Sequence, residues 1–179
     1  MALEKTIQQA NVCLTQLEMP IDVVAEFADL AFRNGKTFIL NPAPATTLPL
    51  DLLAKVTFLT PNEHELGLIT GLPMKSVEDI ATAGKKLLSC GVKNVIVTLG
   101  SKGCLWLDKT KQILIPSMKV TPIDTTGAGD AFNGALAYCL DKGMDVLSSC
   151  QYATKAGALA TLKKGALVSL PTCEEMAKV

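Results

Sequence analysis

Apolar residues recur along this chain in two alternating patterns, which predict alternating strands and helices. Short runs rich in aliphatic and β-branched residues predict four strands, at 12–17, 37–40, 56–60 and 94–99. Apolar residues at helical spacing predict intervening helices at 2–10, 20–33, 61–69 and 76–89. The run 94–99 is almost wholly apolar, as expected of a strand covered on both faces of its sheet.

Residues that start or stop helices agree with these boundaries. Pro20 suits the first turn of a helix, and Asn34-Gly35 suits its end. Gly71 closes the helix that begins at Pro61-Asn62, and Ser76 with Asp79 resembles a capping box.

The C-terminal half follows a different pattern. After a turn at 100–103, the runs 104–107 and 112–115 predict antiparallel edge strands, and the β-rich stretch 113–123 is interrupted by Pro116 and Pro122. Helices are predicted directly after Gly127, at 146–162, and near Cys173.

Strands that alternate with helices predict an α/β fold: a mostly parallel sheet with helices on both faces, in three layers. No linker, repeat or low-complexity tract divides the chain, so residues 1–179 are expected to form a single domain. Ligands of such sheets lie beyond the carboxyl ends of the strands. Polar or Gly-rich groups expected there are Glu18, Asn41, Asn62 with Glu65, the turn 98–100 and the turn 127–130.

The turn 124–130, Asp-Thr-Thr-Gly-Ala-Gly-Asp, is the strongest chemical signal. It lies where an extended segment becomes a helix, whose first N–H groups and dipole favour an anion. Gly127 and Gly129 allow a bulky group to approach the backbone, and Asp130 could take a proton from a hydroxyl. The plainer interpretation is a Gly-rich turn in which Asp130 stabilises a helix start. Neither a dinucleotide-binding G-x-G-x-x-G nor a P-loop is present.

Three further segments carry weaker signals. Asn62 and Glu65 are three residues apart on a helix and could hold hydrated Mg²⁺, although Asn62 could simply cap that helix. The segment 98–103 offers N–H groups and hydroxyls to phosphates, or is an ordinary hairpin turn. The loop 164–171, together with Asp124, could wrap a monovalent cation with carbonyl oxygens.

Composition excludes several functional classes. Lys and Arg together number 17, as do Asp and Glu, so no basic field attracts nucleic acid or an anionic membrane. Every apolar run is interrupted well short of the roughly 18 residues that a membrane span needs. Six cysteines form no C-x-x-C pair and favour reduced thiols in the cytosol, with the nucleus as an alternative location. The single histidine, His64, is expected to be an exposed helix residue and not a zinc ligand.

Taken together and in order, the motifs resemble one family, the ribokinase (PfkB-type) carbohydrate kinases. They are Q-L-E at 16–18, N-P-A-P-A at 41–45, T-P-N-E-x-E at 60–65, T-L-G-S-K-G at 98–103, D-T-T-G-A-G-D-A-F-N-G-A-L at 124–136 and K-G-A-x-x-S-L-P at 164–171. The resemblance covers essentially the whole chain and implies a ribokinase-like fold.

The resemblance also implies a role for individual residues. Asp130 would be the catalytic base, with Gly127, Ala128 and Gly129 as the anion hole, and Glu18 would contact the sugar with Asp130. The residues implied in ATP binding are Asn62, Thr98, Leu99, Gly100, Ser101, Lys102, Gly103, Gly129, Asp130 and Thr154. Glu65 would position Mg²⁺ through water. The residues implied in an activating K⁺ site are Asp124, Thr126, Ala160, Lys163, Gly165 and Ser169. Thr154 and Lys163 depart from the side chains commonest in the family.

The implied activity is ATP-dependent phosphorylation of D-ribose at its 5-hydroxyl, with ATP, Mg²⁺ and K⁺, by a protein that is a homodimer at full length. Family members are longer, with N-terminal strands and a lid that are missing here, so we expect a weak catalyst with an exposed sheet edge. Two alternatives stay open. One is a catalytically silent nucleotide-binding isoform, and the other is a related kinase for another sugar, a nucleoside or a vitamin.

Overall fold

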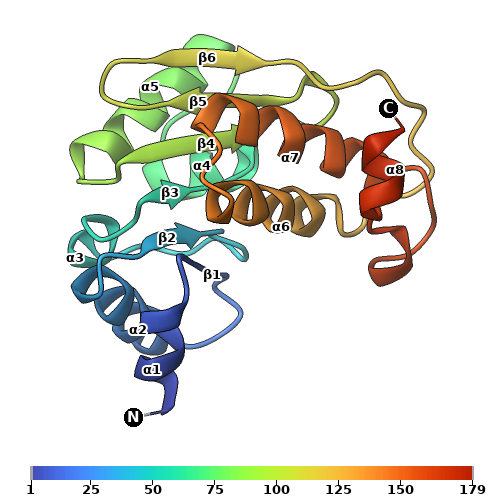
Figure 1. Cartoon of the computed structure of the whole chain (residues 1–179). Helices are drawn as coiled ribbons and strands as arrows, with labels where there is room; N and C mark the ends of the chain where they lie inside the picture. Colours follow the sequence, from blue (N-terminus) through green and yellow to red (C-terminus); the bar gives the residue numbers. More distant parts are fainter. Residues whose placement is uncertain (1, 179) are drawn as a thin grey trace. The chain divides into compact units, whose positions relative to one another are not determined.

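The computed structural model describes residues 2–178, with side chains from Glu4 onward. Figure 1 shows the chain, which divides into two compact units. The first contains residues up to Thr98 together with Leu105–Ile113, and the second contains Leu99–Cys104 together with the residues from Leu114 on.

The first unit is organised by a sheet whose strands follow one another in chain order. Its parallel strands are β1 (Val12–Thr15), β2 (Thr37–Leu40), β3 (Phe58–Leu59) and β4 (Asn94–Thr98). Thr15 pairs with Leu40, and Leu40 pairs with Leu59, so the carboxyl ends of these strands share one edge. The order continues through β5 (Cys104–Leu107) and β6 (Gln112–Ile115). The Asp108 N–H donates to the Lys111 carbonyl across the short turn between them, which makes this last pair antiparallel, as predicted.

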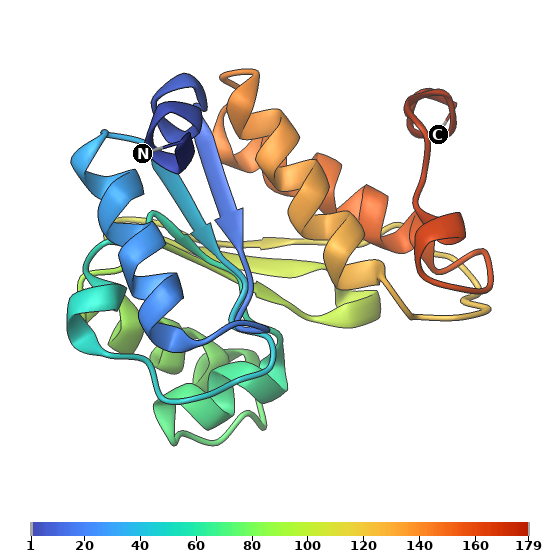
Figure 2. The same cartoon turned by 90° about the horizontal axis from the view of Figure 1, so that it is seen from below.

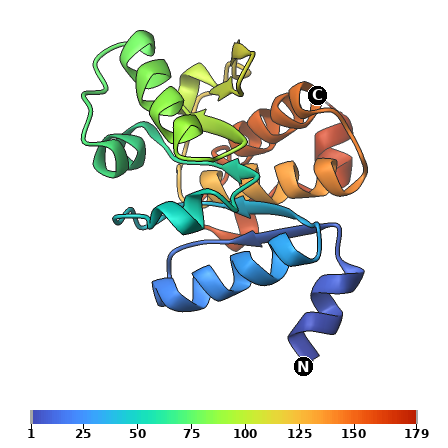
Figure 3. The ribbon, with the colours of Figure 1, turned by 90° about the vertical axis from the view of Figure 1, so that its left-hand side faces the viewer.

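The helices of this unit precede or connect its parallel strands. They are α1 (Ala2–Gln9), α2 (Ile21–Arg33), α3 (Leu50–Leu53), α4 (Glu63–Thr70) and α5 (Val77–Ser89). Because β1 to β4 are neighbours in chain order and connections between parallel strands are right-handed, α2, α4 and α5 lie on the same face of the sheet, as Figures 2 and 3 show. Helix α2 buries Val24, Ala28 and Ala31, which share one face at helical spacing. Phe38, Ile39 and Leu40 of β2 are all fully buried, which shows that both sheet faces are covered. The predicted α/β fold with a mostly parallel sheet is therefore confirmed.

The second unit is built on two packed helices, α6 (Ala128–Asp141) and α7 (Val146–Ala160) (Figure 1). It also contains the short η1 (Gly100–Lys102) and η2 (Leu167–Ser169) and the helix α8 (Cys173–Ala177). Gly157 lets the two long helices approach, because a Cβ there would lie 3.2 Å from the Ala128 carbonyl oxygen. The small residues of α7 therefore serve close helix packing.

Several predicted boundaries were wrong. The strand 112–115 has its predicted bounds, and residues 116–127, which follow it from Pro116 on, have no helix or strand. Other bounds differ. Helix α7 ends at Ala160 and not at Leu162, and β3 has two residues where five were predicted. Helix α3 was not predicted, since a single turn carries little periodicity. Within residues 2–178, no helix is long and apolar enough to cross a membrane.

Candidate functional site

The carboxyl ends of the parallel strands in the first unit carry Glu18, Asn41, Asn62 and Thr98. Glu18 is exposed and follows Leu17, whose N–H donates to the Ala43 carbonyl at 2.9 Å. Asn62 pairs with Thr98 in an isolated parallel bridge, so these two predicted nucleotide contacts lie side by side. The fold thus brings four of the predicted strand-end groups to one edge of the sheet.

Asn62 and Glu65 form a reciprocal capping box at the start of α4. The Glu65 N–H donates to Asn62 Oδ1 at 2.8 Å, and the Asn62 N–H donates to Glu65 Oε2 at 2.8 Å. Burial raises the pKa of Glu65 above its ordinary value. The hydrogen bond from the Asn62 N–H and the charge of nearby His64 lower the pKa by a smaller amount. The capping alternative for Asn62 is therefore present. It uses one side-chain atom of each residue and leaves Asn62 Nδ2 and Glu65 Oε1 outside the box.

In the second unit, the segment 99–103 closes on itself. The Leu99 N–H donates to the Gly103 carbonyl at 2.8 Å, and the Gly103 N–H donates to the Gly100 carbonyl at 3.0 Å. Gly100, Ser101 and Lys102 are exposed. Among the bonds recorded between described residues, none uses the N–H groups of Gly100 and Ser101. The turn therefore offers two exposed donors to an anion.

The Gly-rich turn opens α6 as predicted. Gly127 is the N-cap and has φ +78°, a left-handed conformation that favours glycine. Within the part of the chain that the structure describes, no recorded hydrogen bond uses the N–H groups of Gly127 or Gly129. A Cβ at Gly129 would meet no protein atom within 4 Å, so packing does not require a glycine there. Asp130 is exposed in the first helical turn, beside these donors.

Asp124 fastens the Gly-rich turn to the 165 loop. Its Oδ2 accepts the Gly165 N–H at 2.9 Å, while its Oδ1 accepts the Thr126 N–H at 2.9 Å and the Thr126 hydroxyl at 2.7 Å. These bonds, that from Gly165 foremost, lower the pKa of Asp124 to about 2. The carboxylate is therefore ionised at neutral pH and fixes two loops of the predicted cation site.

Six carbonyl oxygens around these loops have no donor among the hydrogen bonds recorded for described residues. They belong to Asp124, Thr126, Ala160, Lys163, Gly165 and Ser169, which are the six predicted K⁺ ligands. The Lys163 ammonium group is committed elsewhere, to Glu175 Oε1 at 2.6 Å. Lys163 can therefore bind a cation only through its main-chain carbonyl oxygen, and the identity of its side chain does not matter for this contact.

Thr154 is buried within the second unit. Its hydroxyl lies 3.4 Å from Cys104 Sγ, and only 6% of the residue is exposed. The hydrogen bond with Cys104, followed by burial, raises the pKa of Cys150, one turn earlier on α7. The Thr154 hydroxyl is thus occupied inside the protein, and its contact with adenine stays a prediction.

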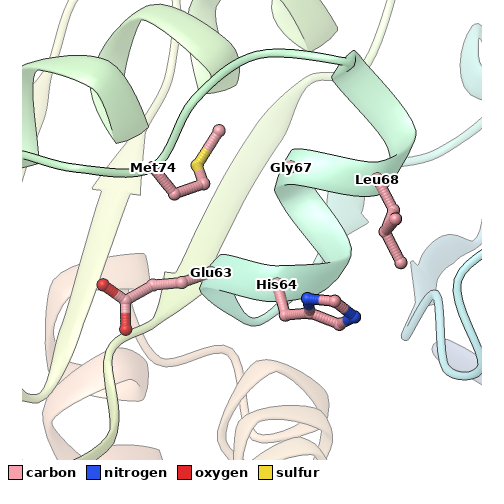
Figure 4. A pocket seen from close by; sticks show the side chains of 5 residues that line it. All are labelled: Glu63, His64, Gly67, Leu68 and Met74. Carbon is pink, nitrogen blue, oxygen red and sulfur yellow. The ribbon is translucent and has the colours of Figure 1, made fainter.

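Within the described residues, no group of three or more His, Cys, Asp and Glu side chains could hold a metal ion. His64 is exposed on α4, as predicted. It lines a shallow pocket with Glu63, Gly67, Leu68 and Met74 (Figure 4). In that view the His64 and Leu68 side chains point to one side and those of Glu63 and Met74 to the other, so they do not converge. None of the predicted site residues lines this pocket.

Gln16 is a residue whose part at this edge was not predicted from the sequence. Its Nε2 donates to Asn41 Oδ1 at 3.3 Å, and Asn41 Nδ2 donates to the Thr60 carbonyl at 3.0 Å. The available signal was position alone, because Gln16 and Asn41 each directly follow a strand.

Comparison with known proteins gives concordant results. The family model described as pfkB family carbohydrate kinase matches residues 2–173. The chain is 37% identical to the ribokinase of Staphylococcus aureus over 174 residues, which is 97% of this chain and 57% of that protein. It is 33% identical to the deoxyribokinase of Salmonella typhi over 170 residues, which is 94% of this chain and 56% of that protein.

A solved structure of Arabidopsis thaliana ribokinase, complexed with ribose and ATP, has the same fold. It superposes with a TM-score of 0.95 at 32% identity, and the match covers 99% of this chain and 58% of that one. The chain therefore spans little more than half the length of these relatives. Matched along nearly all of its own length, it belongs to the pfkB family of carbohydrate kinases and has the ribokinase-like α/β fold.

Proposed function

We propose that this protein phosphorylates a sugar at a primary hydroxyl with ATP, and that the sugar is D-ribose, converted to ribose 5-phosphate. The observation that carries the proposal is the start of α6. There an exposed carboxylate, Asp130, lies in the first helical turn beside the N–H groups of Gly127 and Gly129, for which no protein acceptor is recorded among the described residues. Membership of the family supports the reaction class.

The proposed chemistry assigns one task to each group. Asp130 takes the proton of the sugar 5-hydroxyl while the hydroxyl oxygen forms a bond to the γ-phosphorus of ATP. The bond between that phosphorus and the oxygen that bridges it to the β-phosphate breaks, which releases ADP. The N–H groups at Gly127, Ala128 and Gly129, with the α6 dipole, stabilise charge on the transferred group. Glu18 holds the sugar.

The proposal extends to nucleotide and cations. Asn62 and the segment 98–103 contact the phosphates, with Gly129, Asp130 and Thr154 completing the ATP contacts. Glu65 would hold Mg²⁺ through water, and Mg²⁺ would neutralise phosphate charge. The six carbonyls of Asp124, Thr126, Ala160, Lys163, Gly165 and Ser169 fit K⁺, which prefers uncharged oxygen ligands. Asp124 keeps their two loops together.

Three broader expectations belong to the same proposal. Residues 1–179 act as one kinase domain, which the family model supports because its match runs through both compact units. The six cysteines, all free in the described chain, suit a cytosolic location. A homodimer at full length rests on the family resemblance alone.

Substitution of Asp130 tests the proposal. Asp130→Asn should abolish ribose phosphorylation, measured by ADP release, while ATP affinity measured by calorimetry stays within about twofold because the N–H donors remain. Asp141→Asn, a second exposed carboxylate on α6, is the matched control and should keep wild-type turnover. Full activity of Asp130→Asn would overturn the assignment.

One alternative is a catalytically silent protein that binds nucleotide without turnover. ATP binding by the wild-type chain with no ADP release on any sugar would establish that silent function.

The choice of sugar is a separate question, since the chain is also 33% identical to a deoxyribokinase. A panel of ribose, deoxyribose, fructose and nucleosides, compared by kcat/KM, would identify the substrate.

A further inference from the structure

One buried side-chain amide joins the loops at the carboxyl edge of the first unit. Asn41, directly after β2, is 9% exposed. Its Nδ2 donates to the Thr60 carbonyl at 3.0 Å, its Oδ1 accepts from Gln16 Nε2 at 3.3 Å, and its own N–H donates to the Thr15 carbonyl at 3.0 Å. A single residue thereby links the ends of β1, β2 and β3.

The direction of this amide is fixed by its partners. The Thr60 carbonyl can only accept, so Nδ2 must face it. Oδ1 then faces residue 16, which must be a donor. Glutamine satisfies this requirement, whereas a glutamate would place two acceptors against each other in a partly buried site.

The two partners of Asn41 lead directly to two predicted ligand contacts. Next to Gln16, the Leu17 N–H donates to the Ala43 carbonyl at 2.9 Å, the Leu17 side chain is buried, and exposed Glu18 follows. On the other side, Thr60 is 2% exposed and precedes Pro61 and Asn62. The Pro61 carbonyl accepts the Thr98 N–H at 2.9 Å.

We propose that Gln16 and Asn41 are positioning residues, which hold the sugar contact Glu18 in register with the nucleotide contact Asn62. The inference rests on the proposed sugar-kinase function and extends it to two residues that touch neither substrate. Phosphoryl transfer depends on placement, and a shift of about 1 Å at a remote support can cost two orders of magnitude in rate.

The same unit contains a matched control at the opposite edge of the sheet. Asn94, the first residue of β4, also bridges two groups: its Nδ2 donates to the Thr57 carbonyl at 3.2 Å, and its Oδ1 accepts from Trp106 Nε1 at 3.0 Å. Asn94→Leu removes a comparable bridge but leaves the carboxyl-end loops untouched. A purely structural role would make Asn41→Leu and Asn94→Leu behave alike.

The kinetic test separates sugar from nucleotide. Gln16→Met and Gln16→Glu should raise the KM for ribose about tenfold or more with the KM for ATP within about twofold, because only the Glu18 side is released. Asn41→Leu should raise both KM values. Asn94→Leu should lower the melting temperature and change neither KM. Equal KM values in the Asn41→Leu and Asn94→Leu variants, at a temperature where both are folded, would overturn the inference.

A second readout does not depend on turnover. Hydrogen exchange of the Leu17 amide should be about tenfold faster in Gln16→Met than in the wild-type chain, with the Thr98 amide unchanged. Unchanged exchange at Leu17 refutes the positioning role even in an active enzyme. A wild-type chain that binds no sugar refutes the proposed function and this inference together, whereas normal turnover with an unchanged ribose KM in Gln16→Met refutes this inference alone.

Discussion

Asp124 illustrates how one side chain organises a binding region without being the reactive group. It accepts three hydrogen bonds, two from Thr126 and one from Gly165. Gly165 lies forty-one positions after Asp124 in the sequence. All three bonds favour the charged form, so the pKa falls from its ordinary value of 3.8 to about 2. The stability of the fold therefore rises with pH over the range in which the unfolded chain binds more protons than the folded one.

The stability of the chain should therefore depend on Asp124 in one pH window. Since the folded pKa lies below the unfolded one, the stabilisation is complete above about pH 5 and is lost as the pH falls through about 2. Urea unfolding at stepped pH should show a gap between wild type and Asp124→Asn that is constant above about pH 5 and narrows below it. Thr126→Val, which removes one of the three bonds, should give a smaller gap. A gap that widens on acidification would contradict this explanation.

At the scale of single residues, the sequence predicted where a side chain lies in the fold better than it predicted which hydrogen bonds that side chain makes. It placed Asn62 and Glu65 at a helix start, but it left open whether they cap the helix or face a ligand, and the structure shows the cap. The link from Gln16 to Asn41 could not be predicted, because twenty-five residues separate them and only the parallel register brings them together.

At the scale of elements, the start of α6 contains two glycines with different reasons for being glycine. Gly127 needs its φ of +78°, and a Cβ there would lie 3.3 Å from the Cα and carbonyl oxygen of Ala166. Gly129 has neither constraint, since its Cβ position is empty. Folding accounts for the first glycine, and we infer that ligand access accounts for the second.

Alanine substitutions should separate these two reasons. Gly127→Ala should lower the free energy of unfolding by about 1–2 kcal/mol, the cost of a left-handed L-residue. Gly129→Ala should leave that free energy within about 0.5 kcal/mol of wild type but weaken ATP binding about tenfold, because its methyl group occupies the approach to the backbone. Urea unfolding and calorimetry measure the two effects. Equal destabilisation by both variants would argue against the distinction.

Elements with strong periodicity were predicted well, and weakly patterned ones were not. The alternating strands and helices of the first unit follow directly from apolar runs and helix caps. The strand 112–115 was also predicted correctly, because Pro116 directly after it removes the donor that a ladder requires. Helix α3, a single turn, has too little periodicity to be predicted.

At the scale of the whole molecule, charge is balanced, with 17 basic and 17 acidic residues. The ATP of the proposed reaction would therefore be attracted by local donors, such as the N–H groups at the start of α6, and not by a general positive field. The division into two compact units is a feature of contacts that no composition or periodicity signal marked.

Balanced charge predicts weak contact with polyanions. The full chain should elute from a heparin column at or below about 0.15 M salt, since counterion release requires clustered Lys and Arg. Retention beyond that salt concentration would reveal a basic surface and contradict the expectation. A strongly basic protein of similar size, run in parallel, verifies the column.

Gly103 lies at the crowded end of the 99–103 turn. Its φ is +101°, and a Cβ would lie 1.9 Å from the Ile115 carbonyl oxygen and 2.7 Å from the Ser117 nitrogen. A side chain at position 103 would therefore collide with the main chain of residues 115–117. If this turn contacts nucleotide as proposed, variation that retunes nucleotide preference belongs at the exposed positions 100–102, and those three codons are the target for a library.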